Sequence, residues 1–464
     1  MPRGAAGMSN AHAGPARRGA FDRQVHGELL RLAVPTVVST LAVPLLGIVD
    51  TMVLGLLPDP AHLAGAATAN VIFNSLFFVA GVLRMGSTGL VAQAWGRQDA
   101  RGAALILFQA LALGLAVGSL FIALQTLISA VGFAVVGAAA PVTALGKEYF
   151  AIRIWEAPFA LMLFGIVGYL RGQGDALTPM LLTIGINLVN IAGDLLLVPG
   201  VWGLPSLGVA GAAWSSLAAH LCGWCAAAAV VRRRAAAHWD WSWLLGWRRL
   251  PWRRFLWVQA DLFVRTLTLV LTLGAATTLA ARLHVVHELA AHAILLQLWM
   301  LVAYGVDGFA YATETTVGTW LGRGDAAAAR SSALAALLWG TGTGIAFALA
   351  YAAGADGIAR LFTRDPAVQS VVRSLTWVVA LSQPVNAVAF VLDGILIGAT
   401  DTRYLRNAML LSSFTFACFV AAGWLLAGPS LALVWWALVL WMVARATTLW
   451  VRFRSGRWTG ATSP

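Results

Sequence analysis

Two aspartates and two asparagines are the first residues of this sequence whose types and spacing suggest chemistry. Asp50 lies near the end of a long apolar run, and Asn187, Asn190 and Asp194 recur at i, i+3 and i+7 in another. That spacing places the last three side chains on one face of a helix. Two carboxylates held together in apolar surroundings cannot both stay ionised cheaply, so such a pair binds a proton or another cation. The structural alternative is that both carboxylates bind backbone groups that Pro44 leaves free.

The segments that carry these residues are apolar enough to cross a membrane. Hydrophobic residues make up 60% of the 464 and charged residues 11%, which excludes a soluble domain of this length. A helix needs about 20 apolar residues to cross a bilayer core. Twelve segments qualify: 29–54, 63–90, 102–130, 147–170, 177–198, 207–231, 255–281, 288–317, 327–352, 370–397, 405–427 and 430–451. The sequence therefore predicts an all-α polytopic membrane protein.

The first of these segments is an unusual membrane helix. It contains Pro35, Pro44 and Gly47 and carries Asp50. A charge at the centre of a membrane helix costs about 2.5–3.5 kcal/mol on insertion scales, and a proline removes a helix hydrogen bond. Neighbouring helices or a wet cavity must compensate for both. Asp50 is therefore the first candidate for function.

Basic residues predict the orientation in the membrane. The N-terminal tail, the C-terminal tail and the connections after even-numbered segments hold twenty-two arginines. The opposite loops hold only four basic residues, which are Lys147, Arg282, Arg360 and Arg364. By the positive-inside rule both termini are cytoplasmic. The net charge of +12 follows this topology, so we expect no nucleic-acid partner.

The two halves of the chain are internal repeats. A shift of 226 residues aligns them without a gap and pairs Gly96-Arg97-Gln98-Asp99 with Gly322-Arg323-Gly324-Asp325, Pro158 with Pro384, Gly172 with Gly398 and Asp175 with Asp401. Each half has six segments, so both enter the membrane in the same sense, as parallel repeats do. This predicts two six-helix bundles around a central cleft.

The expected boundaries follow from the repeat. Residues 1–28 form a cytoplasmic tail, 29–231 the N-terminal six-helix lobe, 232–254 a cytoplasmic linker, 255–454 the C-terminal six-helix lobe and 455–464 a second cytoplasmic tail. The linker mixes tryptophan with arginine, which is typical of an amphipathic segment on an anionic membrane surface.

Several motifs in the predicted order resemble the multidrug and toxic compound extrusion (MATE) transporters of the DinF subfamily. They are Pro44-Leu-Leu-Gly-Ile-Val-Asp50-Thr, Leu83-Arg-Met-Gly-Ser-Thr-Gly-Leu-Val-Ala-Gln93, Asn190-Ile-Ala-Gly-Asp194, Asp307-Gly-Phe-Ala-Tyr311 and Leu392-Asp-Gly-Ile-Leu-Ile-Gly-Ala399. The resemblance covers residues 25–455. It implies a secondary antiporter of the bacterial plasma membrane that exports small cationic or amphipathic compounds by alternating access. The family's cation site falls on Asp50, Asn190 and Asp194.

A second group of polar residues is expected to line the substrate cavity. Its members lie in apolar segments of both halves and are Asn187, Arg84, Tyr304, Asp307, Tyr311, Glu314, Asn386 and Asp393. For Arg84 two roles stay open, because it either neutralises one carboxylate of the cation site or lies at the cytoplasmic mouth of the cleft. The acidic excess of the C-terminal half favours cationic substrates, and Asp261 with Arg265 is expected to form an i, i+4 ion pair.

The nature of the coupling ion is inferred from departures from the family pattern. The hydroxyl expected on the sixth segment has no match near Ala212, although Ser215 and Ser216 lie one turn further on. Sodium needs several hard oxygen ligands, so protons are the favoured coupling ion and sodium at Asp50, Asn190 and Asp194 is the second choice. The histidines show no ligand spacing with carboxylates. We expect no cofactor, no firm metal site and a monomer.

Two other classes of function would require other residues in the membrane segments. A flippase for a lipid-linked precursor needs a cavity rich in cations, for which Arg84 and Arg265 are the candidates. A membrane enzyme needs a catalytic cluster such as D-D-x-x-D or H-E-x-x-H, and the sequence contains neither. The sequence thus favours the antiporter, with the flippase as its alternative.

Overall fold

The computed structural model describes residues 22–201, 203, 205–246, 248 and 250–460. Within these residues, twelve helical segments are long and apolar enough to cross a membrane, which confirms the predicted number. The N-terminal six are α1 (Arg23–Gly55), α2 (Ala61–Ala80) with α3 (Val82–Gly96), α4 (Ala100–Ala123), α6 (Ala140–Arg153) with α7 (Ala157–Gly172), α8 (Leu177–Leu197) and α9 (Gly208–Ala235). The C-terminal six are α11 (Trp252–Ala281), α12 (Val286–Gly322), α13 (Ala326–Phe362), α14 (Pro366–Gly398), α15 (Thr402–Leu426) and α16 (Leu431–Arg454).

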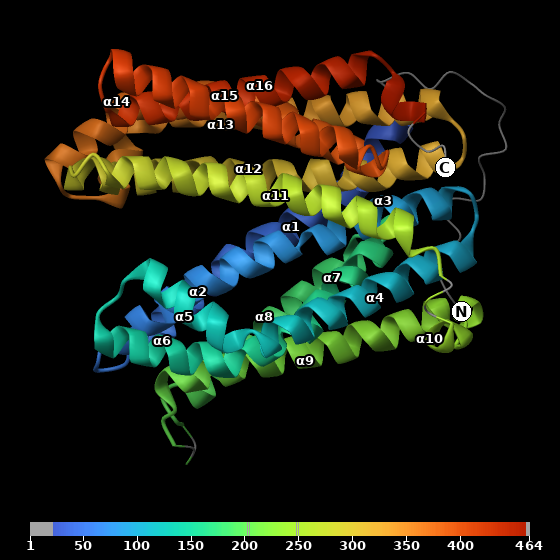
Figure 1. The fold of residues 1–464 in the computed structure, drawn as a ribbon, viewed down its shortest axis with the longest axis horizontal. Coiled ribbons are helices and arrows are strands. Elements are labelled where there is room, and N and C mark those ends of the chain that lie inside the picture. The colour runs from blue at the N-terminus through green and yellow to red at the C-terminus, as the bar shows by residue number, and fades with distance from the viewer. Residues whose placement is uncertain (1–21, 202, 204, 247, 249, 461–464) are drawn as a thin grey trace.

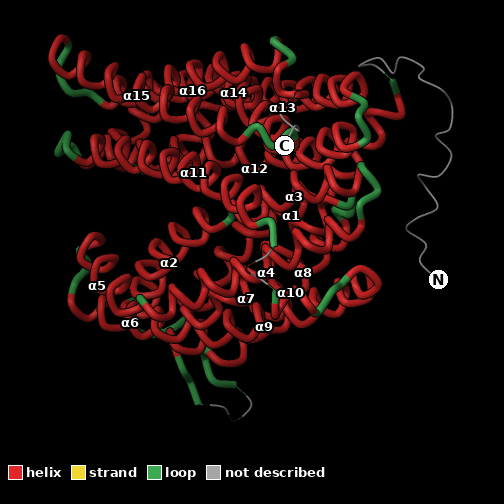
Figure 2. Tube along the Cα trace, turned by 45° about the vertical axis from the view of Figure 1, so that its right-hand side comes forward, coloured by secondary structure: helices red, strands yellow, loops and turns green. Residues whose placement is uncertain are grey.

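The helices form two bundles that meet at one end only. Figure 1 shows α11–α16 as one lobe and α1–α9 as the other. The lobes converge where α3, α12 and α14 end, and they stand apart at the end that holds α5 (Gln125–Val136) and the start of α14. The turned view in Figure 2 shows the same V-shaped arrangement. Two six-helix bundles are therefore confirmed.

Glycines allow the lobes to touch at the closed end. A methyl group at Gly89 would overlap the carbonyl oxygen of Ile397, and one at Gly96 would overlap that of Thr319. Such close backbone approach between membrane helices depends on small residues. Between these contacts the buried Gln93 donates to the carbonyl oxygen of Gly398 (3.0 Å) and accepts from Arg254 (3.0 Å). We call these residues the interlobe seal.

The backbone of the two lobes repeats at the spacing that the sequence predicts. Gln98 and Gly324 are 226 positions apart, and both have a positive φ, of 59° and 78°. Each turn then ends on an aspartate that caps the next helix, because Asp99 accepts from Gly102 N and Asp325 from Ala328 N. An aspartate at the N-cap satisfies a free backbone N–H group. The same local chemistry thus builds equivalent turns in both halves.

Two of the membrane-crossing segments are broken helices. The second segment changes helix at Gly81, between α2 and α3. The fourth is interrupted by the 3₁₀ turn η1 (Ile154–Glu156), after which Pro158 lies in the first turn of α7. A proline is tolerated there because the first N–H groups of a helix have no partner within the helix. The second break carries Arg153 and Glu156, two polar residues described below.

The connection between the lobes packs against the protein. It contains η2 (Ala236–His238) and α10 (Ser242–Leu245). The rings of Trp239 and Trp243 each lie 5.8 Å from that of Phe108 on α4, and Asp240 pairs with Arg101 at 2.9 Å. These two tryptophans therefore cover the N-terminal lobe, whereas Trp241 between them is exposed.

Candidate functional site

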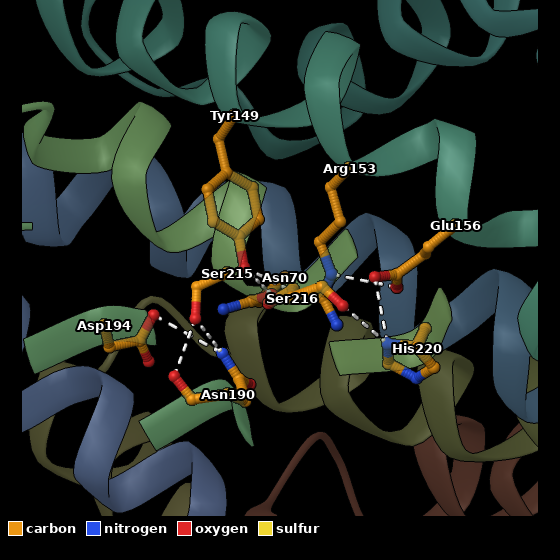
Figure 3. A network of polar contacts seen from close by, with 9 residues as sticks. All are labelled: Asn70, Tyr149, Arg153, Glu156, Asn190, Asp194, Ser215, Ser216 and His220. Carbon is orange, nitrogen blue, oxygen red and sulfur yellow. Dashed lines mark hydrogen bonds and ion pairs between the residues drawn. The ribbon is translucent and has the colours of Figure 1, made fainter. Parts of the chain in front are cut away.

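The structure brings three helices together around the predicted cation site. Asn190 and Asp194 lie one turn apart on α8 and are 4% and 1% exposed. The Asn190 amide donates to Ser215 Oγ (2.9 Å) and to Asp194 Oδ1 (3.4 Å), and Ser215 Oγ donates back to the Asn190 carbonyl oxygen (2.6 Å) (Figure 3). Asp50 on α1 lies close enough to Asp194 for the two carboxyl groups to interact.

Two carboxylate oxygens of this site have no hydrogen-bond partner within the described part of the chain. They are Asp50 Oδ1 and Asp194 Oδ2, and both are buried atoms. Ser215 reaches the site because Gly193 leaves no side chain between α8 and α9, and a methyl group at Gly193 would overlap Ser215 Oγ. A buried carboxylate oxygen without a partner is costly, so the site is chemically suited to a proton or a small cation.

A hydroxyl was expected on the sixth membrane segment beside the predicted cation site, and Ser215 provides it. Its position is one turn beyond Ala212, and the close packing at Gly193 brings it to Asn190. The inferred lack of a hydroxyl beside the cation site was therefore wrong.

A second polar group adjoins this site and was missed from the sequence. Arg153, the last residue of α6, donates through Nε to Glu156 (3.0 Å) and through Nη1 to the hydroxyl of Tyr149 (2.8 Å), and it also contacts Asn70 Oδ1 (Figure 3). The other oxygen of Glu156 faces His220 Nδ1 at 3.2 Å. The sequence did contain a signal for this group, because Arg153 and Glu156 are opposite charges three residues apart in an apolar segment, just before Pro158.

Arg84 does not neutralise the N-terminal carboxylates. Its guanidinium lies 4.0 Å from the ring centroid of Tyr311, on α12 of the other lobe, and the Arg171 guanidinium lies 5.1 Å from the same centroid. The cation beside the carboxylate site is Arg153 instead. Arg84 therefore belongs to the contact between the lobes.

The interlobe contact holds charges of both signs. Tyr311 donates to Asp307 Oδ2 (3.4 Å), and Thr315 donates to the carbonyl oxygen of Arg171 (2.9 Å). Glu314 is fully buried and its Oε2 has no hydrogen-bond partner among the described residues.

The remaining predicted residues lie in two places. Asn187 donates to the carbonyl oxygen of Ala42 on α1 (3.0 Å), and the carbonyl oxygen of Tyr304 accepts from Thr40 (3.1 Å), so both residues line contacts of α1. Asn386 is completely buried and binds Ser382 of its own helix at 3.2 Å.

Asp393 lies in the core of the C-terminal lobe, between two arginines. One oxygen, Oδ2, accepts from both Arg265 on α11 and Arg445 on α16. The expected pair of Asp261 with Arg265 is wrong, because Asp261 binds Arg406 on α15 at 2.6 Å. Tertiary neighbours outcompete the local i, i+4 partner.

These arginines remove the expected acidic excess of the C-terminal half. The carboxylates Asp307, Glu314 and Asp393 lie among Arg84, Arg171, Arg265 and Arg445. Formal charges there are balanced to within one unit. The acidic site of the molecule is the one in the N-terminal lobe.

Within the described residues, no three histidine, cysteine, aspartate or glutamate side chains form a group that could hold a metal ion. The groups beside the Asp50 and Asp194 carboxylates are of mixed type, because Asn190 presents its amide N–H groups and Ser215 its hydroxyl.

Comparisons with known proteins agree with this architecture. The MatE family model matches residues 35–196 and 263–425. The chain is 34% identical to DNA damage-inducible protein F of Escherichia coli K12 over 94% of each chain. It is 31% identical to the probable multidrug resistance protein NorM of Deinococcus radiodurans, over 81% of this chain and 83% of that protein.

A solved structure shares the fold. It is described as the outward-facing conformation of a multidrug resistance MATE family transporter of the MOP superfamily, with a TM-score of 0.79, 19% identity and coverage of 94% of this chain and 96% of that one. Together with the family match over both lobes, the motifs and the twelve-helix fold, this shows that the chain belongs to the MatE family of multidrug efflux transporters, as a relative of DNA damage-inducible protein F.

Proposed function

We propose that this protein exports small cationic or amphipathic compounds in exchange for protons, by alternating access of the central cleft. The observation that carries the proposal is the pair of Asp50 and Asp194, in which Asp194 is buried, Asp50 is half-buried, and each carboxylate has one buried oxygen without a partner among the described residues. A pair of this kind holds a proton in one state and releases it in another. Release can be linked to substrate binding if both depend on the same conformational change.

The geometry around the pair supports protons over sodium. The Asn190 amide turns its N–H groups, and not its oxygen, toward Asp194 and Ser215. The Arg153 guanidinium acts on both carboxylates. A fixed positive charge and an amide donor oppose a metal ion that needs several oxygen ligands. A proton needs only one carboxylate oxygen.

The arginines of the C-terminal side do not favour a flippase. Arg265 and Arg445 are both engaged by Asp393. Arg84 and Arg171 lie beside Tyr311 in the contact between the lobes, and each keeps an N–H group without a hydrogen-bond partner among the described residues. A site for a lipid diphosphate needs cations that are free to bind its oxygens. Multidrug relatives such as NorM also support export of small compounds.

The antiporter is tested by driving efflux with one gradient at a time. The full chain is reconstituted in liposomes, and efflux of a fluorescent organic cation is followed under a proton gradient or a sodium gradient. We expect the proton gradient to drive efflux and the sodium gradient to leave it at background. Efflux driven by sodium alone would reverse the choice of ion, and efflux driven by neither gradient would contradict the antiporter.

The interlobe seal supports alternating access. If both termini are cytoplasmic, as the positive-inside rule predicts, the contacts at Gly89, Gly96 and Gln93 lie at the cytoplasmic end, and the lobes stand apart on the opposite side (Figure 1). The inward-facing state then requires these contacts to separate. We expect Gly96→Val to destabilise the closed end by about 1–3 kcal/mol, because the added side chain overlaps the Thr319 carbonyl oxygen and overpacking has costs of this order.

This prediction is measured with a single cysteine placed in the seal at Ala92 and labelled by a water-soluble maleimide. Gly96→Val should raise the labelling rate and slow efflux. The matched control is Gly342→Ala on α13, where an added methyl group meets nothing within 4 Å. Equal labelling and efflux in all three proteins would show that the lobes do not separate at this seal.

A further inference from the structure

His220 is the one histidine that the structure places against the polar group beside the coupling site. It lies on α9, one turn beyond Ser216, and its Nδ1 is 3.2 Å from Glu156 Oε2 and 3.0 Å from the Ser216 carbonyl oxygen. Both neighbours of Nδ1 are acceptors. Nδ1 therefore carries the hydrogen, and Nε2 is the nitrogen that gains or loses a proton.

His220 is partly exposed, whereas its partner Glu156 is buried. The His220 side chain is 26% exposed and that of Glu156 is 1% exposed. An imidazolium formed at His220 would lie beside a buried carboxylate, which favours the charged form. The Nδ1 hydrogen is donated to the Ser216 carbonyl oxygen, so Glu156 Oε2 acts on the ring as a nearby negative charge and not as its hydrogen-bond acceptor.

Glu156 has two competing partners. Its Oε1 accepts from Arg153 Nε at 3.0 Å, and its Oε2 faces His220. One carboxylate cannot fully neutralise two adjacent cations. A proton on His220 therefore weakens the ion pair between Glu156 and Arg153.

Arg153 is placed to respond to this competition. From Glu156 it extends through Nη1 to Tyr149 and Asn70, on the side of the coupling site, and it already interacts with Asp50 and Asp194.

The surroundings of His220 contain few other charges. The charged groups that interact with it are Glu156 on η1 and Arg153 on α6. The nearby polar residue of α2 is the neutral Asn70, and the carboxylate of α8, Asp194, is bonded to Asn190. The net charge of these residues therefore depends on whether His220 and the Asp50–Asp194 pair carry their protons.

We propose that His220 is a second proton-binding site of the N-terminal lobe, and that its protonation transfers Arg153 from Glu156 to the Asp50–Asp194 pair. His220 Nε2 takes a proton from water, and the imidazolium engages Glu156. The freed guanidinium favours ionisation of the carboxylate pair, which then loses its own proton. One proton enters and one leaves, so the charge of the group is unchanged. This proposal rests on the proposed coupling role of Asp50 and Asp194.

The first test is the pH profile of efflux from liposomes driven by a proton gradient. His220→Gln keeps a polar side chain but cannot take up a proton. We expect it to lose the part of the profile that falls between about pH 5 and about pH 8, the range in which histidine titrates, while its maximal rate stays within about threefold of wild type. Glu156→Gln should have the same effect, and the double variant should be no worse than either single one, because the two residues act as a unit.

The matched control is His62→Gln, in the same lobe, since His62 accepts a hydrogen bond from Val209 N and has no carboxylate partner in the hydrogen bonds and ion pairs of the described chain. Its pH profile should match that of wild type. A profile of His220→Gln that superimposes on wild type would overturn the second site, as would strictly additive effects of the two substitutions.

A second measurement follows the protonation of His220 directly. Among the eight histidines of the ¹⁵N-histidine-labelled protein, the Nε2 signal that His220→Gln removes should titrate in this range, and Glu156→Gln should shift that titration. Absence of a titrating signal assignable to His220 would overturn the proposal. A failure of the proposed coupling role of Asp50 and Asp194 gives a different result, because Asp50→Asn would then transport normally, whatever the outcome for His220→Gln.

Discussion

Asp50→Asn is expected to reduce efflux driven by a proton gradient strongly while substrate still binds. The amide has the shape of the carboxyl group but does not titrate in this range, so the pair with Asp194 loses the proton that the gradient moves. Coupling free energies between sites are typically 1–3 kcal/mol. We therefore expect gradient-driven efflux to fall about tenfold to a hundredfold, with substrate affinity changed only a few-fold.

The measurement is efflux from liposomes at several pH values, with binding measured by fluorescence on the same preparation. Asp194→Asn should behave differently, because removal of one of two interacting carboxyl groups shifts the pH dependence of the other. Asp59→Asn is the matched control, since Asp59 lies outside the membrane segments and its carboxylate accepts from the backbone of Ala61. Wild-type efflux by Asp50→Asn from about pH 6 to about pH 8 would move the coupling site to Asp307, Glu314 or Asp393.

The fold could be predicted from the sequence because its signals are local or periodic. Long apolar segments predict the twelve membrane helices, and the constant shift of 226 residues predicts two equivalent lobes. The turns at Gln98 and Gly324 show why the shift survives, because both need a left-handed backbone conformation followed by a capping aspartate. Each of these features depends on residues that are close in the sequence.

The proximity of Asn190 and Asp194 was predictable for a similar reason, whereas their neighbours were not. Asn190 and Asp194 share a helix face by their spacing alone. Ser215 joins them only because Gly193 lets α9 approach, and that distance depends on packing between helices. Arg153 and Glu156 were missed because their segment reads as one continuous helix, whereas η1 breaks it, with Glu156 facing His220 on α9 and Arg153 reaching Asn70 on α2.

Ion pairs were predicted least well. Spacing of four residues made Asp261 and Arg265 partners, but in the folded lobe each binds a residue more than one hundred positions away. Local pairs on a helix contribute only about 0.2–0.5 kcal/mol. A buried pair with good geometry is a far stronger constraint, and it depends on which helices become neighbours.

The second large effect is expected at Asp393, and it concerns stability. Asp393 Oδ2 accepts from Arg265 and Arg445, whose side chains are 7% and 1% exposed. Asp393→Asn leaves two buried guanidinium groups without a counter-charge, although its amide oxygen can still accept from both in the place of Oδ2. Removal of one partner from a buried ion pair costs about 3–5 kcal/mol. We expect a loss of unfolding free energy of this order, measured by denaturant titration of the purified protein in detergent.

A substrate-binding role for Asp393 leads to a different result, in which Asp393→Asn folds normally and changes only which compounds are exported. Asp307→Asn separates the two cases, because Asp307 makes one long side-chain hydrogen bond, from Tyr311 at 3.4 Å, and should lose less than about 1 kcal/mol. Replacing all three residues by Arg265→Met, Asp393→Leu and Arg445→Met should recover most of the lost stability, since apolar residues of similar size often substitute for a buried ionic group without penalty. If the single variant is as stable as wild type, the two arginines are neutralised by other groups, and Asp393 is free to serve the substrate.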